Sequence, residues 1–335
     1  MNSFLDPAIL FFAFGVLAGT LKSNLHIPEP ISRFLSLYLL MALGLKGGFA
    51  LAKSGLTSEV ATSLTCAVTL ALAIPALSYL ILRRIVSAYD AAAVAATYGS
   101  VSAVTFITAV QFLESHGVSY GGHMAAALAL MESPAIVIAL VTANILRQRA
   151  TASDALVQQG GSAVLRIGTF PGLSIGRVLH ESFTDGAQLL LLGSMLVGLL
   201  SGEAGKASMQ PFSGDLFKGM LAFFLLDMGL LTARSVGQLK GKSPFLLAYG
   251  IFAPLLHAAL ALALAAAVGL SVGNGALLAV LAASASYIAV PAVLRHALPE
   301  ANPSLYFGMS LGLTFPFNIL LGIPLYVSAA RYLLS

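Results

Sequence analysis

Two serine-rich segments, one in each half of the chain, hold the residues whose types and spacing best suit chemistry. Residues 99–102 read Gly-Ser-Val-Ser and residues 283–286 read Ala-Ser-Ala-Ser, and each segment interrupts a long apolar run. A helix broken inside a membrane exposes main-chain N–H groups on one side of the break and carbonyl groups on the other. Such N–H groups attract an anion, whereas carbonyl and serine oxygens suit Na⁺. The candidate binding residues of the two segments are Gly99, Ser100, Ser102, Ser284 and Ser286.

The matching positions of the two segments separate two explanations. Small residues also let membrane helices pack closely, and that explanation would suffice for a single segment. Two such segments at corresponding places instead favour one binding site formed by two interrupted helices, as in secondary transporters.

Further polar residues inside apolar runs extend the candidate site. Glu132 lies near the middle of a run, so its carboxylate could ligate Na⁺, carry a proton, or stay protonated and bonded to the main chain. Thr105 follows the first segment, and Asn318 lies in the region of the second half that corresponds to Glu132. The residues that we assign as candidate Na⁺ ligands are Ser100, Ser102, Glu132 and Ser286.

Two other carboxylates have competing explanations. Asp227 lies at mid-depth and either faces the path of a substrate or pairs with Lys46. Asp90 precedes the first serine segment much as Asn274 precedes the second, and N-capping of a helix explains both.

The composition identifies a membrane protein that crosses the bilayer many times. The chain of 335 residues is 58% hydrophobic and only 9% charged, which is too few charges to cover a soluble domain. Its one cysteine excludes an internal disulfide, and no basic tract suggests a nucleic-acid partner. The sequence lacks GxSxG, HExxH and Walker motifs, so we expect neither an enzyme nor an ATP-driven pump, and no cofactor besides Na⁺ as coupling ion.

Ten apolar spans must position these residues. We expect an all-α protein of ten transmembrane helices at 7–22, 31–52, 60–82, 89–112, 120–146, 187–201, 215–236, 243–269, 272–297 and 303–330. The polar segment 147–186 then links a first five-helix unit, 1–146, to a second, 187–335. Because five is odd, the second unit must be inverted relative to the first.

Short matches between the halves support this repeat, and charge sets its orientation. Residues 17–21 match 196–200, and 43–45 match 228–230. With the N-terminus outside, twelve Lys and Arg residues lie on the cytoplasmic side and five outside, as the positive-inside rule requires. We therefore expect a plasma-membrane protein, bacterial inner membrane, with both termini outside and the linker 147–186 inside.

The chain resembles the sodium-dependent bicarbonate transporters of the SbtA type over nearly its whole length. The motifs that carry the resemblance are Ile27-Pro28-Glu29-Pro30 leading into 43–48, then 98–106, 131–135 and 283–289. The resemblance implies a bile-acid/sodium symporter-like fold with two broken, crossing helices. It implies a core domain from spans 3–5 and 8–10 and a gate or scaffold domain from spans 1, 2, 6 and 7.

The resemblance also implies a function and partners. Family members take up bicarbonate with Na⁺ as homotrimers whose core moves past the scaffold in an elevator-like, alternating-access step. Some bind a cytoplasmic PII-like regulatory protein, although the linker 147–186 is the part of this chain least like the family.

Three hypotheses follow. The first is a Na⁺:bicarbonate symporter, which agrees with the absence of Lys and Arg at mid-depth because a small monovalent anion needs no buried cation. The second is a Na⁺-coupled transporter of the same fold for another small organic or inorganic anion, or an exchanger of H⁺ for Na⁺. The third is a membrane scaffold or sensor whose linker binds a cytosolic partner.

Overall fold

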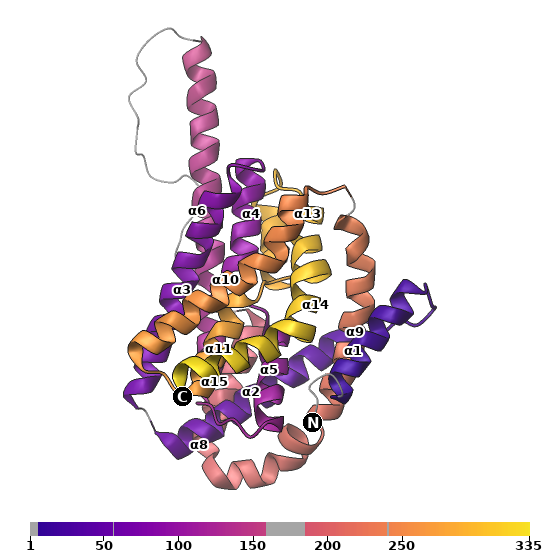
Figure 1. The fold of residues 1–335 in the computed structure, drawn as a ribbon, viewed down its shortest axis with the longest axis vertical. Coiled ribbons are helices and arrows are strands. Elements are labelled where there is room, and N and C mark those ends of the chain that lie inside the picture. Colours follow the sequence, from indigo (N-terminus) through magenta and orange to yellow (C-terminus); the bar gives the residue numbers. More distant parts are fainter. Residues whose placement is uncertain (1–5, 56, 159–184, 240) are drawn as a thin grey trace.

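The computed structural model describes residues 6–55, 57–158, 185–239 and 241–335, and these form an assembly of helices (Figure 1). In the first half the helices are α1 (Pro7–Thr20), α2 (Glu29–Ser54), α3 (Ser58–Leu82), α4 (Ala88–Gly99), α5 (Ala103–Ser115) and α6 (Met124–Gln158). In the second half they are α8 (Gly186–Met209), α9 (Phe217–Val236), α10 (Pro244–Val268), α11 (Val272–Ala283), α12 (Ala289–Ala297), α13 (Pro303–Met309), α14 (Phe315–Phe317) and α15 (Ile323–Leu334).

Helices occupy all ten predicted ranges, and the molecule is a multi-pass membrane protein. Seven helical segments in the described part of the chain are long and apolar enough to cross a bilayer, and α1 and α11 are shorter apolar helices. Large apolar side chains are exposed on the outer helices, among them Leu17, Leu72, Phe252 and Leu256. Such a surface is stable in lipid and unfavourable in water.

Both predicted interruptions are present. The fourth span consists of α4 and α5, separated at residues 100–102, and the ninth consists of α11 and α12, separated at 284–288. These broken spans are the most interior elements: 94% of the apolar window of Ala88–Ser115 is buried, against 39% for α3 and for α10. Helices α3 and α10 therefore stand between the broken helices and the lipid.

Three segments differ from the predicted spans. The α8 range contains two helical segments: the non-helical angles of Gly202 (φ 57°, ψ −143°) end the first one near the predicted residue 201, and a second segment continues to Met209. Helix α6 was expected to end near 146 but continues to Gln158. The last span contains two π-helical segments, η4 (Ser310–Thr314) and η5 (Asn318–Gly322). Most of the predicted linker, 159–184, lies outside the described residues.

Helices of the two halves pair with each other through small residues. Helix α1 packs along α9, and α2 packs along α8. A Cβ added to Gly15 would lie 3.1 Å from Gly229 Cα, and one added to Gly19 would lie 2.7 Å from Ala233 Cβ. Only small residues allow two helix backbones to approach so closely.

The α2–α8 pair repeats the contacts of the α1–α9 pair. A Cβ added to Gly44 would lie 2.8 Å from Ser194 Cβ, and one added to Gly198 would lie 3.1 Å from Gly48 Cα. The sequence match of 17–21 with 196–200 aligns Gly15 with Ser194 and Gly19 with Gly198. The match of 43–45 with 228–230 likewise aligns the glycines of α2 with the small residues of α9, so the two interfaces use equivalent positions.

The two ends of the molecule are distinct. The first described residues and the C-terminus both lie in the lower part of Figure 1, whereas the C-terminal end of α6 extends from the top. This placement agrees with termini on one side of the membrane and the linker on the other.

Candidate functional site

The two breaks contact each other directly in the interior. The main-chain N–H of Ser102 donates to Ser284 Oγ at 3.0 Å, and that of Ser286 donates to the Thr97 carbonyl at 2.8 Å. All four predicted serines are between 1 and 4% exposed. We call this region, residues 97–102 and 283–288, the crossing.

Helices α5 and α12 begin at the crossing, so two helix N-termini, which carry partial positive charge, lie there. Ser102 is the N-cap of α5, and its Oγ accepts from Thr105 N at 3.2 Å and from Thr105 Oγ1 at 3.0 Å. Ser286 Oγ accepts from Val290 N at 3.3 Å at the start of α12. Unpaired N–H groups at such starts favour a bound anion. The structure thus brings Thr105 to the crossing with Ser102.

Two helices also end at the crossing and contribute main-chain carbonyls. Helix α4 ends at Gly99 and α11 at Ala283. Asn318 Nδ2 donates to the Ala283 carbonyl at 2.9 Å, and Asn318 Oδ1 accepts from Tyr326 OH at 2.9 Å. The π-helical segment that begins at Asn318 therefore holds the predicted amide against the second break.

Glu132 joins the crossing through its main chain and a neighbouring helix through its side chain. Ser100 Oγ donates to the Glu132 carbonyl oxygen at 3.4 Å. The carboxylate accepts instead from Gln188 Nε2, on α8, at 2.7 Å. Among the described residues, no hydrogen bond links this carboxylate to the four serines.

Asp227 does not pair with Lys46, so that alternative was wrong. Its Oδ2 accepts from the Ser32 hydroxyl, while Lys46 Nζ forms an ion pair with Glu114 at 3.0 Å. Lys46 Nζ also lies 4.0 Å from the centroid of the Phe217 ring, at the start of α9. Asp227 itself is 5% exposed and makes no described hydrogen bond to the crossing.

Gly99 has a packing role. A Cβ at this position would lie 2.5 Å from the ring of Pro75 on α3. The absence of a side chain therefore lets the end of α4 approach α3 and sets the place of the first break.

The loops that hold the broken helices follow one pattern in both halves. Asp90 Oδ1, near the start of α4, accepts from Asn302 N at 2.7 Å. Asn274 Oδ1, near the start of α11, accepts from Gly121 N at 2.7 Å. The predicted N-capping was wrong for both residues, because Ser87 is the N-cap of α4 and Ser271 is the N-cap of α11. Asp90 and Asn274 each tie the start of one broken span to the loop before the last span of the other half.

Other partners at the crossing were not predicted from the sequence. They are the main-chain carbonyls of Thr97 and Ala283, Gln188 beside Glu132, and Tyr287, whose OH lies 3.6 Å from Met228 Sδ. Carbonyls carry no signal in residue type, and Gln188 reaches Glu132 only because α8 crosses α6. Tyr287 was recognisable as the aromatic residue next to the second serine pair.

The chemistry available at the crossing is neutral and oxygen-rich. Among the described residues, no Lys or Arg side chain takes part in its hydrogen bonds, and no group of three His, Cys, Asp or Glu could hold a metal ion. Helix starts, hydroxyls and carbonyls can hold a small anion and a monovalent cation without any ion pair.

Comparison with known proteins identifies the family. The family model described as the Na⁺-dependent bicarbonate transporter superfamily matches residues 7–331. No curated protein matches the chain. The match includes both serine segments, the crossing and all the described helices in between, and the family is one of transporters rather than enzymes. The chain therefore belongs to the Na⁺-dependent bicarbonate transporter superfamily.

Proposed function

We propose that this protein is a plasma-membrane symporter that binds bicarbonate and Na⁺ together at the crossing. Membership in the family implies Na⁺-coupled bicarbonate transport. The observation that carries the proposal for the site is the direct bonding of the two breaks, Ser102 N–H to Ser284 Oγ and Ser286 N–H to the Thr97 carbonyl.

The anion is assigned to the starts of α5 and α12. Bicarbonate carries one negative charge, and two helix N-termini with Ser102 and Ser286 beside them supply N–H and O–H donors. A polyvalent anion would need a cationic side chain, and none bonds there in the described part of the chain. This reasoning favours a small monovalent anion.

Na⁺ is assigned to the oxygen-rich side of the crossing, with Ser100, Ser102, Ser286 and Glu132 as its ligands. Ser100 and Glu132 are already adjacent through the 3.4 Å hydrogen bond. The Na⁺ concentration gradient can drive a monovalent anion inward, and the membrane potential adds about 2.3 kcal/mol per net charge per 100 mV when more than one Na⁺ accompanies each anion.

We infer alternating access by movement of a core, α3–α6 with α10–α15, against a scaffold, α1, α2, α8 and α9. Scaffold helices pair with each other across the halves, and the matched contacts of their glycines support an inverted repeat. The described polar contacts between scaffold and core include Glu132 with Gln188 and Lys46 with Glu114.

Uptake of labelled bicarbonate by proteoliposomes at alkaline pH tests the function. We expect uptake that requires an inward Na⁺ gradient and disappears when choline replaces Na⁺. Uptake indifferent to Na⁺ would contradict the coupling, and competition by another small anion without bicarbonate uptake would favour a different substrate on the same fold.

The variant Glu132→Gln tests the sodium assignment. Losing a charge-assisted contact costs about 1.5–3 kcal/mol, so we expect the half-saturating Na⁺ concentration to rise about tenfold or more. The control Gln188→Ala removes the described partner of the carboxylate but keeps its charge, so Na⁺ affinity should stay near wild type. A Glu132→Gln protein with wild-type Na⁺ dependence would remove Glu132 from the site.

A further inference from the structure

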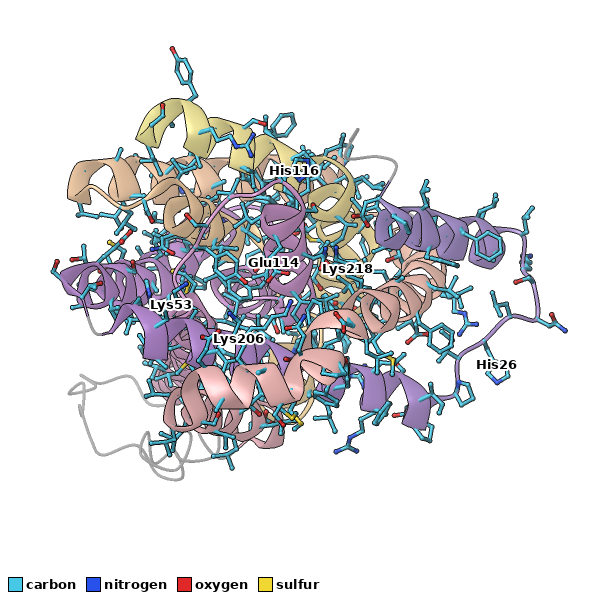
Figure 2. All side chains as sticks on the ribbon, turned by 90° about the horizontal axis from the view of Figure 1, so that it is seen from below. His26, Lys53, Glu114, His116, Lys206 and Lys218 are labelled. Carbon is cyan, nitrogen blue, oxygen red and sulfur yellow. The ribbon has the colours of Figure 1, made fainter. Side chains whose placement is uncertain are left out.

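A large cavity lined by several charged side chains opens at the end of the molecule that carries the termini. It has a volume of about 720 Å³ and lies between α2, α8, the π-helical segment η2 (Gln210–Asp215) and α9 on one side and α5 with its following loop on the other. Figure 2, which looks at this end, shows Lys53, Lys206, Lys218 and Glu114 around the same region. The residues that carry its charge are Lys46, Lys53, Lys206, Lys218, Glu114 and Asp215.

The cavity is positively charged, with four lysines against two carboxylates. Lys46 is neutralised by Glu114, which also accepts from Tyr120 OH at 2.9 Å. Lys206 pairs at 3.3 Å with Glu203. Lys53 and Lys218 have no acidic partner within ion-pair distance in the part of the chain that the structure describes. Asp215 offsets one of these two charges, so the cavity keeps a net positive charge.

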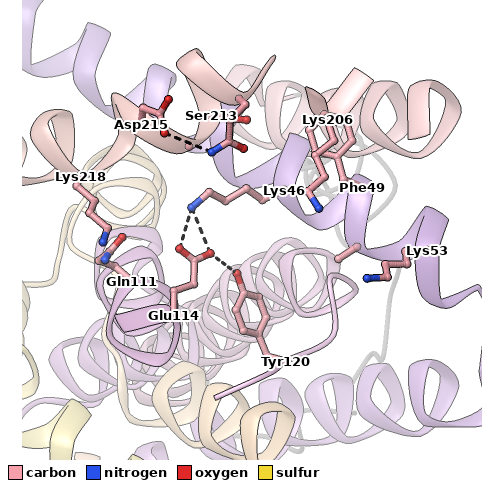
Figure 3. Close-up of a pocket in the computed structure, with 13 residues that line it drawn as sticks. Lys46, Phe49, Lys53, Gln111, Glu114, Tyr120, Lys206, Ser213, Asp215 and Lys218 are labelled. Carbon is pink, nitrogen blue, oxygen red and sulfur yellow. Dashed lines mark hydrogen bonds and ion pairs between the residues drawn. The ribbon is translucent and has the colours of Figure 1, made fainter. Parts of the chain in front are cut away.

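A buried amide faces this charge without a partner for its oxygen end. Gln111 is 5% exposed, lines the cavity, and its Oε1 has no hydrogen-bond partner among the described residues. Figure 3 shows Gln111 and Lys218 on one side of the cavity, with the Lys46–Glu114 pair between them and Lys206. An unsatisfied buried acceptor is costly, and the hydroxyl group of bicarbonate can donate a hydrogen bond to Gln111 Oε1 and remove that cost.

One helix, α5, has residues at both the crossing and the cavity. Helix α5 begins at the crossing with Ala103 and carries Gln111 and Glu114 at the cavity. Eight residues of helix between Ala103 and Gln111 span about 12 Å. A ligand held at Gln111 is therefore about two helical turns from the proposed site.

We propose that this cavity is an anion-collecting vestibule, in which Lys53 and Lys218 concentrate a monovalent oxyanion of the bicarbonate class and Gln111 binds it before it reaches the crossing. The proposal rests on the proposed function. Clefts lined by charge of one sign raise the local concentration of the opposite ion and its association rate. The same field opposes Na⁺, so the vestibule acts on the two transported ions in opposite directions.

The variant Lys53→Gln/Lys218→Gln tests the vestibule in the proteoliposome assay. Removing two charges about 10 Å from an anion raises the KM for bicarbonate about fourfold near 10 mM ionic strength. The difference fades near 300 mM, where screening acts within a few ångströms, and kcat stays unchanged. The half-saturating Na⁺ concentration falls. The charge-conserving control Lys53→Arg/Lys218→Arg keeps wild-type values.

An active Gln variant with unchanged KM at low ionic strength would overturn the vestibule, as would a fall in kcat that the Arg control shares. An increase in the KM for bicarbonate that persists at high salt would also overturn it. So would an increase in that KM that comes with an increase in the half-saturating Na⁺ concentration. Absence of Na⁺-dependent uptake in the wild type would instead contradict the proposed function.

A second measurement reads the charge of the cavity without transport. In a Cys66→Ala background, the variant Ala50→Cys places one thiol in the lining. We expect a negatively charged methanethiosulfonate to react faster than a positively charged one, and the ratio to fall when Lys53→Gln/Lys218→Gln is added. Equal rates, unchanged by the lysine substitutions, would overturn the proposal.

Discussion

Ser102 combines a structural role with a proposed binding role. It caps α5, accepts from two atoms of Thr105, and donates its main-chain N–H to Ser284 Oγ. Its side chain caps α5 and also bonds Tyr287, and its main chain bonds Ser284, so both join the two halves. A side-chain substitution therefore removes the cap and the hydroxyl but leaves the main-chain bond to Ser284 in place.

We expect Ser102→Ala to lose about 1 kcal/mol of stability through the missing cap and, in addition, most Na⁺-dependent uptake. The matched control is Ser87→Ala, because Ser87 caps α4 far from the crossing. It should lose comparable stability and retain uptake. Thermal unfolding in detergent and uptake in proteoliposomes measure the two effects, and equal loss of uptake in both variants would assign Ser102 to folding alone.

At this scale the sequence indicates the residues but not their partners. The serine pairs stand out because polar residues repeat at matching places in apolar runs. The bonds from Ser102 to Ser284 and from Lys46 to Glu114 depend on which faces of distant helices meet. Asp227 shows the limit: a mid-depth carboxylate and a lysine suggested an ion pair, but Ser32 bonds the carboxylate.

At the scale of elements, glycine contacts hold the proposed scaffold together. A Cβ on Gly229 would meet the Phe12 carbonyl and lie 3.0 Å from Gly15 Cα. We expect Gly229→Ala to destabilise the α1–α9 pair by about 1–3 kcal/mol, as overpacking does. Thermal unfolding in detergent measures this loss.

The same helix supplies the control. A Cβ on Gly219 would meet nothing within 4 Å, so Gly219→Ala should raise stability by up to about 1 kcal/mol through helix propensity. Equal unfolding temperatures for the two variants would contradict the close approach of α1 and α9.

Span positions and breaks followed from hydropathy because an apolar run must be about 20 residues long to cross a bilayer. The π-helical turns of the last span could not be predicted from hydropathy, because Asn318 and Thr314 there bond residues of other segments. Thr314 Oγ1 donates to the Gly250 carbonyl at 2.6 Å and bonds Tyr98 OH at 2.6 Å. Such contacts join residues far apart in sequence and leave no periodic signal.

At the scale of the whole molecule, the orientation in the membrane is open to direct measurement. We expect a C-terminal reporter to lie outside and a reporter inserted after Gln158 to lie in the cytoplasm, since more Lys and Arg lie on that side. Alkaline phosphatase and green fluorescent protein fusions distinguish the two. Fluorescence from the C-terminal fusion would reverse the orientation, and the vestibule would then face the cytoplasm.

Assembly and regulation stay predictions from the resemblance. A homotrimer and a PII-like cytoplasmic partner are both implied there, and residues 159–184 of the linker lie outside the described part of the chain. Helix α6 is joined to the loop that follows α12: Arg147 Nε donates to Glu300 Oε1 at 2.7 Å. This contact lowers the pKa of Glu300, so the pair persists at neutral and alkaline pH.

The pairing of α1 with α9 and of α2 with α8 also dictates an order of events during synthesis. Helices α1 and α2 leave the ribosome first, yet the partners that cover their glycines are encoded beyond residue 185. Until α8 and α9 insert, these surfaces can only contact lipid or the insertion machinery. Biogenesis of the first half therefore ends only when the second half has entered the membrane.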